Sequence, residues 1–517
     1  MKRAVALAIT AALIGGLESG AACGGKGGPT RAPTLSGQPV AEPADALMAF
    51  VPPDASFVLL RDQQAGLSDA FSPAGQTVKA IAELRTMLDP AAGPGSAFVA
   101  ALADALLDPA QAPAATIGWR EGESAMAAYG LGIDTVIRMA LDGARLRATL
   151  ERAAAVSHFP LIAVRWHDRP YYRIEIPTPA FSIWLLLRID DHGAVAAFTG
   201  DPDRLVEHVM AERPSGPRFD AGAAVAATYP DRRGEARFAG AIYPARLAGA
   251  LGGVLARRPP WLAVFKGCPA AAVDLLAATP SLTMGWVPGR GRFEGVAALD
   301  VDARTVERLA HDQRAIPRWS ANDDGMQVGL GVGPRTLFEV SEPWLTAYDR
   351  MATACESRGD VVASLRAMMS APAVALIDAA VIVWDPRSKS MAAAVGARDL
   401  KALWAGLRTL VPLRAQPPAP MEQLTFQGMV LMGGVDALGV GGGDAGAAAI
   451  TALMAAGPGP SEIAAIHFGR ALVEEARRDA AGAWGGADVS SMDVHLRVRD
   501  RRLLLEVAAT SASSLAR

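Results

Sequence analysis

The sequence predicts an α+β protein built from mixed, mainly antiparallel sheets with helices packed on one face, in two duplicated copies. Three observations lead to this prediction. Strand–turn–helix units recur along the chain, hairpin signals lie between them, and residue matches recur at spacings that shrink from 270 to about 210. Alternation of strands and helices alone would favour a parallel sheet, but hairpins require antiparallel neighbours.

The first 22 residues have the pattern of a signal peptide. A basic start at Lys2 and Arg3 precedes an apolar run over 4–17, and small residues at 20–22 offer a cleavage site. As a helix the apolar run would cover only about 21 Å, against a hydrocarbon core of ~30 Å, so it is too short to remain as a membrane span. We therefore expect residues 1–22 to direct export and to be removed.

Cys23 follows this cleavage site directly. Bacterial lipoprotein signals place a cysteine here, which becomes the lipid-bearing N-terminus, whereas ordinary secretory cleavage would leave a free thiol. Residues 23–44 are rich in Gly and Pro and are typical of a flexible tether, with an r.m.s. reach of about 25 Å. A tether implies that its far end is held, so lipidation of Cys23 is our expectation.

The remaining chain contains the recurring units. The expected strands of the clearest units are 57–60, 139–141, 196–198 and 297–299, and the helices after the last three are 144–152, 204–212 and 304–310. Similar units begin near Ala239, Val328, Ala392, Ala437, Ala464 and Leu504. An Asp or Gly before each helix suits capping of its free amide groups, and Pro202 suits a first helical turn. Hairpin signals stand at 167–170 and 288–291.

Matched residues arrange these units into two copies, 45–315 and 316–517. The matches are Val58 with Val328 at a spacing of 270, Trp119 and Met126 with Trp384 and Met391 at 265, Gly200-Asp201 with Gly443-Asp444 at 243, Leu247 with Leu472 at 225, and Arg292 with Arg502 at 210. A spacing that only shrinks is expected if the second copy has lost loop residues, so the pattern predicts an ancestral duplication.

Five candidate metal ligands fall in two turns of a predicted meander over 161–198. They are His167, Asp168, Asp190, Asp191 and His192. The first and third turns of a meander lie at the same end of the sheet, where such groups would suit zinc or another divalent ion if they converged. Asp, His and Gly also occupy solvated turns for conformational reasons, and we prefer that interpretation.

Two further features concern covalent and cofactor chemistry. Cys268 and Cys355 would remain as a pair in an oxidising compartment, where a disulfide is expected, the alternative being two separate buried thiols. Residues 441–446 satisfy G-x-G-x-x-G, but the next strand, 463–468, lacks the acid that binds a ribose. We therefore predict a structural turn there and no cofactor.

Charge excludes one class of partner. The chain has 50 Lys and Arg against 53 Asp and Glu, with no basic run, so we expect no nucleic-acid partner. The sequence also lacks the H-E-x-x-H, G-x-S-x-G, S-x-x-K and P-loop motifs.

The signal, the tether that begins at Cys23 and the tandem units together resemble uncharacterised bacterial cell-envelope lipoproteins with tandem strand–helix repeats. The resemblance implies export and a lipid tether to the membrane, facing the periplasm or cell surface, or otherwise secretion; it implies no reaction. We expect a non-enzymatic, envelope-tethered lipoprotein that binds a protein partner or an envelope component. The alternatives are a metal-dependent envelope enzyme that uses the two turns, and a carrier of an apolar ligand, which needs a deep apolar cavity.

Overall fold

The computed structural model describes much of the chain from Pro43 onward. The described residues are 43–61, 82, 85–86, 88–108, 116–120, 123–177, 182–213, 238–256, 267–288, 292–317, 325–355, 361–385, 390–409, 413, 415–420, 422–426, 429–434, 437–442, 448, 450–451, 458–473, 489–499 and 502–511. The predicted signal peptide, Cys23 and all but the last two residues of the predicted tether lie outside them. No helix within these ranges is long and apolar enough to cross a membrane.

The chain forms two compact units. Unit 1 comprises Met1–Val264, Leu282–Phe293 and Ala480–Asp488, and unit 2 comprises Phe265–Ser281, Glu294–Asp479 and Val489–Arg517. These limits differ from the predicted 45–315 and 316–517, because 294–315 belong to unit 2. The reason is strand pairing: the strand over Arg292–Asp300 pairs with the last strand of the chain.

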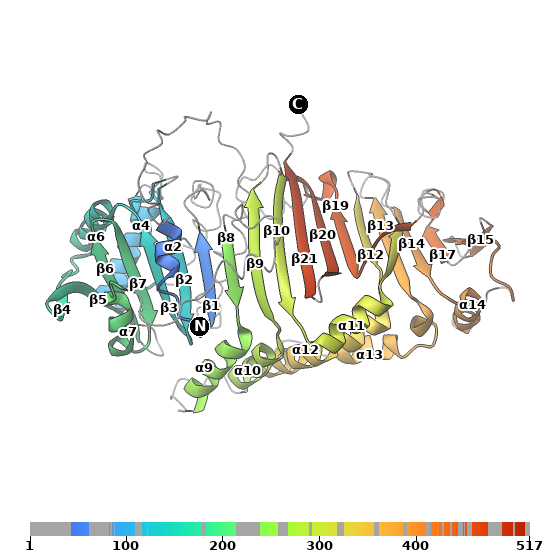
Figure 1. Ribbon diagram of the computed structural model, residues 1–517, viewed down its shortest axis with the longest axis horizontal. Helices are drawn as coiled ribbons and strands as arrows, with labels where there is room; N and C mark the ends of the chain where they lie inside the picture. Colours follow the sequence, from blue (N-terminus) through green and yellow to red (C-terminus); the bar gives the residue numbers. More distant parts are fainter. Residues whose placement is uncertain are drawn as a thin grey trace. The chain divides into compact units, whose positions relative to one another are not determined.

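Unit 1 contains an antiparallel sheet in the order β9-β8-β1-β2-β3-β7-β6-β5-β4 (Figure 1). Its strands are β1 (Phe57–Arg61), β2 (Ala125–Leu131), β3 (Asp134–Ala140), β4 (Ala163–Trp166), β5 (Arg169–Pro177), β6 (Ser182–Asp190), β7 (Gly193–Thr199), β8 (Phe238–Ile242) and β9 (Ser281–Pro288). Its helices are α2 (Pro43–Met48), η1 (Pro90–Ala92), α4 (Pro94–Leu106), α6 (Gly143–Ser157), α7 (Pro202–Met210) and α9 (Pro244–Ala256). The α+β class and the antiparallel pairing are confirmed.

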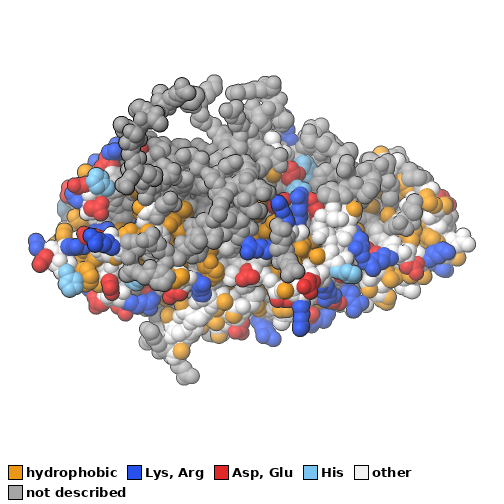
Figure 2. Space-filling view, viewed as in Figure 1, with side chains coloured by type: hydrophobic (Ala, Val, Ile, Leu, Met, Phe, Trp, Pro, Cys, Tyr) orange, Lys and Arg blue, Asp and Glu red, His pale blue; other side chains and the backbone are white. Residues whose placement is uncertain are grey.

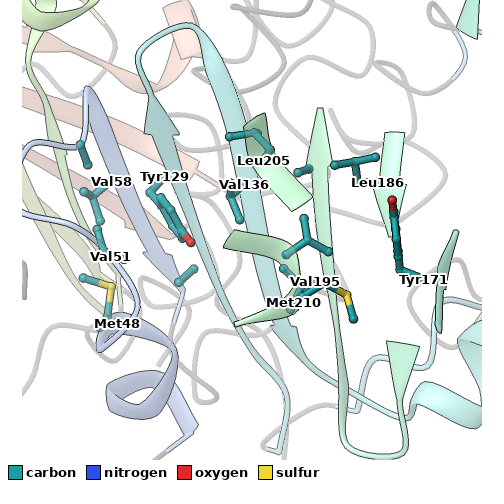
Figure 3. Packing of buried hydrophobic residues seen from close by; sticks show 14 residues of the cluster. Met48, Val51, Val58, Tyr129, Val136, Tyr171, Leu186, Val195, Leu205 and Met210 are labelled. Atoms are coloured by element: carbon teal, nitrogen blue, oxygen red, sulfur yellow. The ribbon is translucent and has the colours of Figure 1, made fainter. Parts of the chain in front are cut away.

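Helices pack on both faces of this sheet rather than on one. On one face Val58, Tyr129 and Val195 pack with residues of α2 and α7, as Figure 3 shows. On the other face Ala194 and Ala196 pack with α4 and α6. Successive residues of a strand point to opposite faces, and residues 193–197 of β7 are buried without interruption. A continuous apolar run of this kind signals cover on both sides.

In unit 2 the strands pair in the order β10-β21-β20-β19-β12-β13-β14-β17-β16-β15. Its strands are β10 (Arg292–Asp300), β12 (Met326–Leu330), β13 (Ala379–Asp385), β14 (Ser390–Gly396), β15 (Gln423–Phe426), β16 (Met429–Gly433), β17 (Ala437–Gly442), β19 (Ala464–Phe468), β20 (Val489–Arg499) and β21 (Arg502–Ser511). A separate antiparallel ribbon joins β11 (Arg314–Pro317) to β18 (Pro458–Glu462). The helices are α10 (Cys268–Ala278), α11 (Ala303–Asp312), α12 (Pro334–Ala354), α13 (Val361–Met369), η3 (Val374–Leu376) and α14 (Leu400–Arg408).

Aspartates cap several helices, as the turn pattern predicts. Asp142 Oδ1 accepts a hydrogen bond from the Arg145 amide at 3.1 Å, and Asp399 Oδ1 accepts one from the Ala402 amide at 2.9 Å. Asp302 caps α11 in the same way and also accepts the hydroxyl proton of Thr305, and these bonds lower the pKa of Asp302. Asp201 makes no such bond to α7.

The two units share one order of strand pairing. Neighbouring strands in unit 1 follow the order β8-β1-β2-β3-β7-β6-β5. The corresponding strands of unit 2, counted along the chain, follow the order β19-β12-β13-β14-β17-β16-β15. This agreement supports the predicted duplication, which stays a prediction until the units are superposed. The Trp119–Trp384 match is wrong, because it equates Met126 on β2 with Met391 on β14, whereas the strand order equates β2 with β13.

Candidate functional site

The two candidate metal-binding turns lie at the same end of the unit 1 sheet. The β5–β6 register pairs Tyr172 with Leu187, so the β4–β5 turn and the β6–β7 turn share one end, as the meander predicts. His167 and Asp168 adopt φ angles of 45° and 63°. Tight hairpins need this left-handed conformation, which Asp and His adopt more readily than most residues.

The side chains of these turns do not assemble a metal site. Within the described ranges, no group of three or more His, Cys, Asp and Glu is placed to hold a metal ion. His167 instead packs edge-on against Trp166, with ring centroids 4.2 Å apart. Asp190 accepts a hydrogen bond from the His192 amide at 3.1 Å, and Asp191 is exposed. His167, Asp168 and Asp190 therefore contribute to the geometry of the two turns.

Two other predicted features have different outcomes. Cys268 and Cys355 form a disulfide in unit 2, with Cα atoms 4.7 Å apart, that ties the start of α10 to the end of α12. The structure describes only the start of the glycine motif at 441–446, because β17 ends at Gly442 and residues 443–446 lie outside the described ranges. Gly443-Asp444, the predicted match of Gly200-Asp201, lies among these residues. Cys23 also lies outside them.

Sequence reasoning missed an open apolar face on the sheet of unit 2. Residues paired directly across antiparallel strands lie on one face, so the register defines two neighbouring rows. The first row, from β21 to β14, is Val507, Val494, Ile466, Val328, Ile382 and Ala393. The second row, from β20 to β14, is Met492, Phe468, Met326, Trp384 and Met391. We call these residues the open face.

The open face is partly exposed although every member is apolar. Met391 is 61% exposed and Ile382 is 41% exposed, and the other nine side chains are partly buried. Among the described helices, α14 packs on Leu431 and Leu438 at one flank, and α11 and α12 pack near Leu503 at another. The largest contiguous apolar patch on a protein surface is often a binding site.

The reverse face of the same strands is covered. Val381, Ala392 and Ala465 are almost completely buried beneath Ile316 of β11 and Ile450. In unit 1 one row of the sheet runs through Leu59, Ala128 and Met284, and all three side chains are buried. This row of unit 1 is therefore more deeply buried than the two apolar rows of unit 2.

A polar cluster lies at the edge of the covered face. His467 Nδ1 lies 2.7 Å from Asp493 Oδ1, and His495 Nδ1 lies 3.0 Å from Glu462 Oε2. Arg497 bridges Glu462 at 2.8 Å and Glu506 at 3.2 Å. Glu462 is only 1% exposed, and the His495 imidazole and the ion pair with Arg497 offset the cost of burying its carboxylate.

The sequence contained signals for both features. Residues 491–499 alternate strictly, with Met492, Val494 and Leu496 on one face of β20 and Asp493 and His495 on the other. Such alternation predicts one apolar and one polar face of a strand. Which face stays open depends on where helices far along the chain pack, and local periodicity carries no information about that.

Two surface pockets of the described structure are wide open to solvent. One, of about 440 Å³, lies at the end of α6 beside His158 and Tyr172, and the other, of about 680 Å³, lies between α10 and α12 with Asp274, Glu339 and Arg350 on its walls. Neither is the deep apolar cavity that a carrier needs. On the face drawn in Figure 2, Lys and Arg side chains are interspersed with Asp and Glu.

Comparisons with known proteins give little further guidance. No family model matches the chain, and no curated protein matches it. A search of solved structures finds similarity to crystal form III of TP0453, with 9% sequence identity, a TM-score of 0.23, and coverage of 54% of this chain and 90% of that one. At this TM-score the likeness bears on neither fold nor function.

Proposed function

We propose that this chain is a lipid-anchored protein of the bacterial envelope that binds a protein partner through the open face of unit 2. The observation that carries the proposal is the exposure of Met391 and Ile382 within two rows of apolar side chains that contain no charged residue. The Cys23 signal and the tether that follows support the location. Apolar side chains held in water by a rigid sheet gain about 25 cal/mol per Å² when a partner covers them.

A photo-reactive amino acid tests this proposal in the full-length, exported chain. We expect p-benzoyl-phenylalanine placed at Met391 to crosslink to a protein in intact envelopes. Met368 is the matched control, because it is also a methionine of unit 2, is 50% exposed and belongs to α13 rather than to the strands of the open face. Equal capture from both positions, or from neither, would show that the open face is not the binding surface.

A charge on the open face supplies the second arm. Ile382→Glu introduces a carboxylate that a bound partner would bury without a counter-ion, which costs several kcal/mol. Since 1.4 kcal/mol corresponds to a tenfold change in affinity, crosslinking from Met391 should fall at least tenfold. The unfolding midpoint should change little, because Ile382 is already exposed.

A further inference from the structure

We infer that unit 1 pairs with unit 1 of a second copy of this chain through β4, so that the two sheets join edge to edge. β4 ends the sheet of unit 1, and among the described strands it pairs with β5 alone (Figure 1). Its residues Ala163, Val164 and Arg165 are all exposed. An open strand edge presents backbone N–H and C=O groups at the spacing of a β-ladder, which another strand complements. This pairing involves a different unit from the open face, so it is independent of the proposed function.

The hairpin that follows β4 decides which of its residues face the open edge. Trp166 pairs with Arg169 across a two-residue turn, which makes them a hydrogen-bonded pair. Hydrogen-bonded and non-hydrogen-bonded pairs alternate along an antiparallel ladder, so Val164 also bonds to β5. The N–H and C=O groups of Ala163 and Arg165 therefore point away from β5, toward the edge.

The edge of β4 is complementary to itself when a two-fold axis passes through Val164. An antiparallel second copy then places Val164 opposite the partner's Val164. Ala163 lies opposite the partner's Arg165, and Arg165 lies opposite the partner's Ala163, so every outward-facing residue meets an outward-facing residue. Ile162 lies opposite the partner's Trp166. The same patch on both copies thus forms a closed two-fold interface.

Neighbouring positions of the axis fit less well. An axis through Arg165 would place two guanidinium groups directly opposite each other, which is unfavourable. An axis through Ala163 would pair Arg165 with Leu161. The Ile162 amide donates to the Pro160 carbonyl at 2.8 Å, so Leu161 belongs to a tight turn and not to an extended strand. The axis through Val164 avoids both conflicts.

The exposed apolar side chains of this segment fall on the pairs that the two-fold axis creates. Ile162 is 69% exposed and Val164 is 37% exposed, and both lie on the same face as Trp166. Aliphatic and aromatic side chains directly across antiparallel strands attract each other. Five paired residues span only about 17 Å, so the contact is smaller than the ~800 Å² per partner of a stable interface. We therefore expect a weak dimer, which a covalent trap can capture.

A cysteine at the two-fold axis tests the pairing. Val164→Cys is made in the Cys23→Ser chain, in which Cys268 and Cys355 are bonded to each other and the introduced thiol is the free one. Directly opposed residues of a non-hydrogen-bonded pair have Cα atoms about 4.5 Å apart, a separation that a disulfide spans. Mild oxidation with copper phenanthroline should link two copies at position 164. Val156→Cys is the matched control, because it is also a valine of unit 1, is 71% exposed and belongs to α6.

A cysteine two residues away tests the position of the axis. The two copies of residue 162 would lie four residues apart along the paired strands, which is about 14 Å, so Ile162→Cys should not link them. Linkage of Ile162→Cys as efficient as that of Val164→Cys would overturn the two-fold pairing.

A charge at the axis supplies an arm that needs no oxidation. The parent chain should associate as its concentration rises in analytical ultracentrifugation. Val164→Lys opposes two ammonium groups and should weaken this association at least tenfold, whereas Val156→Lys should leave it unchanged. Equal sedimentation of the parent and Val164→Lys, or equal yields of linked dimer from Val164→Cys and Val156→Cys, would overturn the pairing. Neither measurement involves the open face, so such a result would leave the proposed function standing.

Discussion

Asp399 and Asp201 hold the same position, immediately before a helix, yet only one of them caps its helix. Asp399 Oδ1 accepts the Ala402 amide proton, which satisfies one of the free donors at the start of α14. Before α7, the Thr199 hydroxyl accepts the amide proton of Asp201 at 2.9 Å, and the Asp201 carboxylate makes no cap bond. The turn pattern alone does not distinguish the two sites.

This difference gives a paired prediction. Asp399→Ala should lower the free energy of unfolding by about 1 kcal/mol, the usual cost of losing a side-chain cap. Asp201→Ala should lower it by at most a few tenths, because no cap bond is lost. Urea unfolding of both variants measures the two values. An equal loss at the two positions would show that the Asp399 bond contributes nothing specific.

At the same scale, residue type and local spacing predicted some roles well. The turn conformation at His167 and the hydrogen bond from the His192 amide to Asp190 follow from local sequence, because conformational preference acts within a few residues. The polar cluster was missed, since His467 meets Asp493, and His495 meets Glu462, only through tertiary packing.

At the scale of elements, the strand matches contain a one-residue slip. The Tyr243 amide donates to the Ser56 carbonyl before α9, and the Gly469 amide donates to the Gly325 carbonyl before the helical residues 470–473. These bonds equate Ser56 with Gly325, so Val58 corresponds to Gln327 and not to Val328. A slip of one residue turns a side chain to the opposite face of the sheet. Strands could thus be matched from sequence, but not the faces that they present.

The disulfide is the covalent link between two such elements. Its Cα–Cα distance of 4.7 Å lies within the usual range, and it closes a segment with a sequence separation of 87. The chain-entropy model gives about 4.6 kcal/mol for a loop of this size, an upper value. Cys268→Ser with Cys355→Ser should therefore destabilise unit 2 by up to that amount, as measured by urea unfolding.

A Cys23→Ser background isolates this effect, because Cys268 and Cys355 are then the remaining cysteines. In that background a reducing agent should lower the unfolding midpoint of the parent and leave the double-serine variant unchanged. Peptide mapping without reduction should recover Cys268 joined to Cys355. Free thiols at both positions would contradict the disulfide.

At the scale of the whole molecule, the two units combine one strand order with different surfaces. In unit 1 helices pack on both faces of the sheet, whereas in unit 2 one part of a face is partly exposed. The α+β class was predictable, because hairpin and helix signals are local. The open face was not, because exposure depends on which distant helices pack where. If the units arose by duplication, they kept the strand order and diverged in how their sheet faces are covered.

The lipid anchor remains the prediction on which the location of the whole molecule depends. We expect the mature chain to begin at Cys23 with a lipid on its thiol, so that wild-type protein enters the detergent-rich phase. Cys23→Ser should move it to the aqueous phase, because a serine hydroxyl provides no thioether for the lipid. The circular dichroism spectrum should stay the same, since α2, where the described structure begins, starts only at Pro43. Wild-type protein found entirely in the aqueous phase, or a mass equal to that of the unmodified chain from Cys23, would refute the anchor and leave a secreted protein.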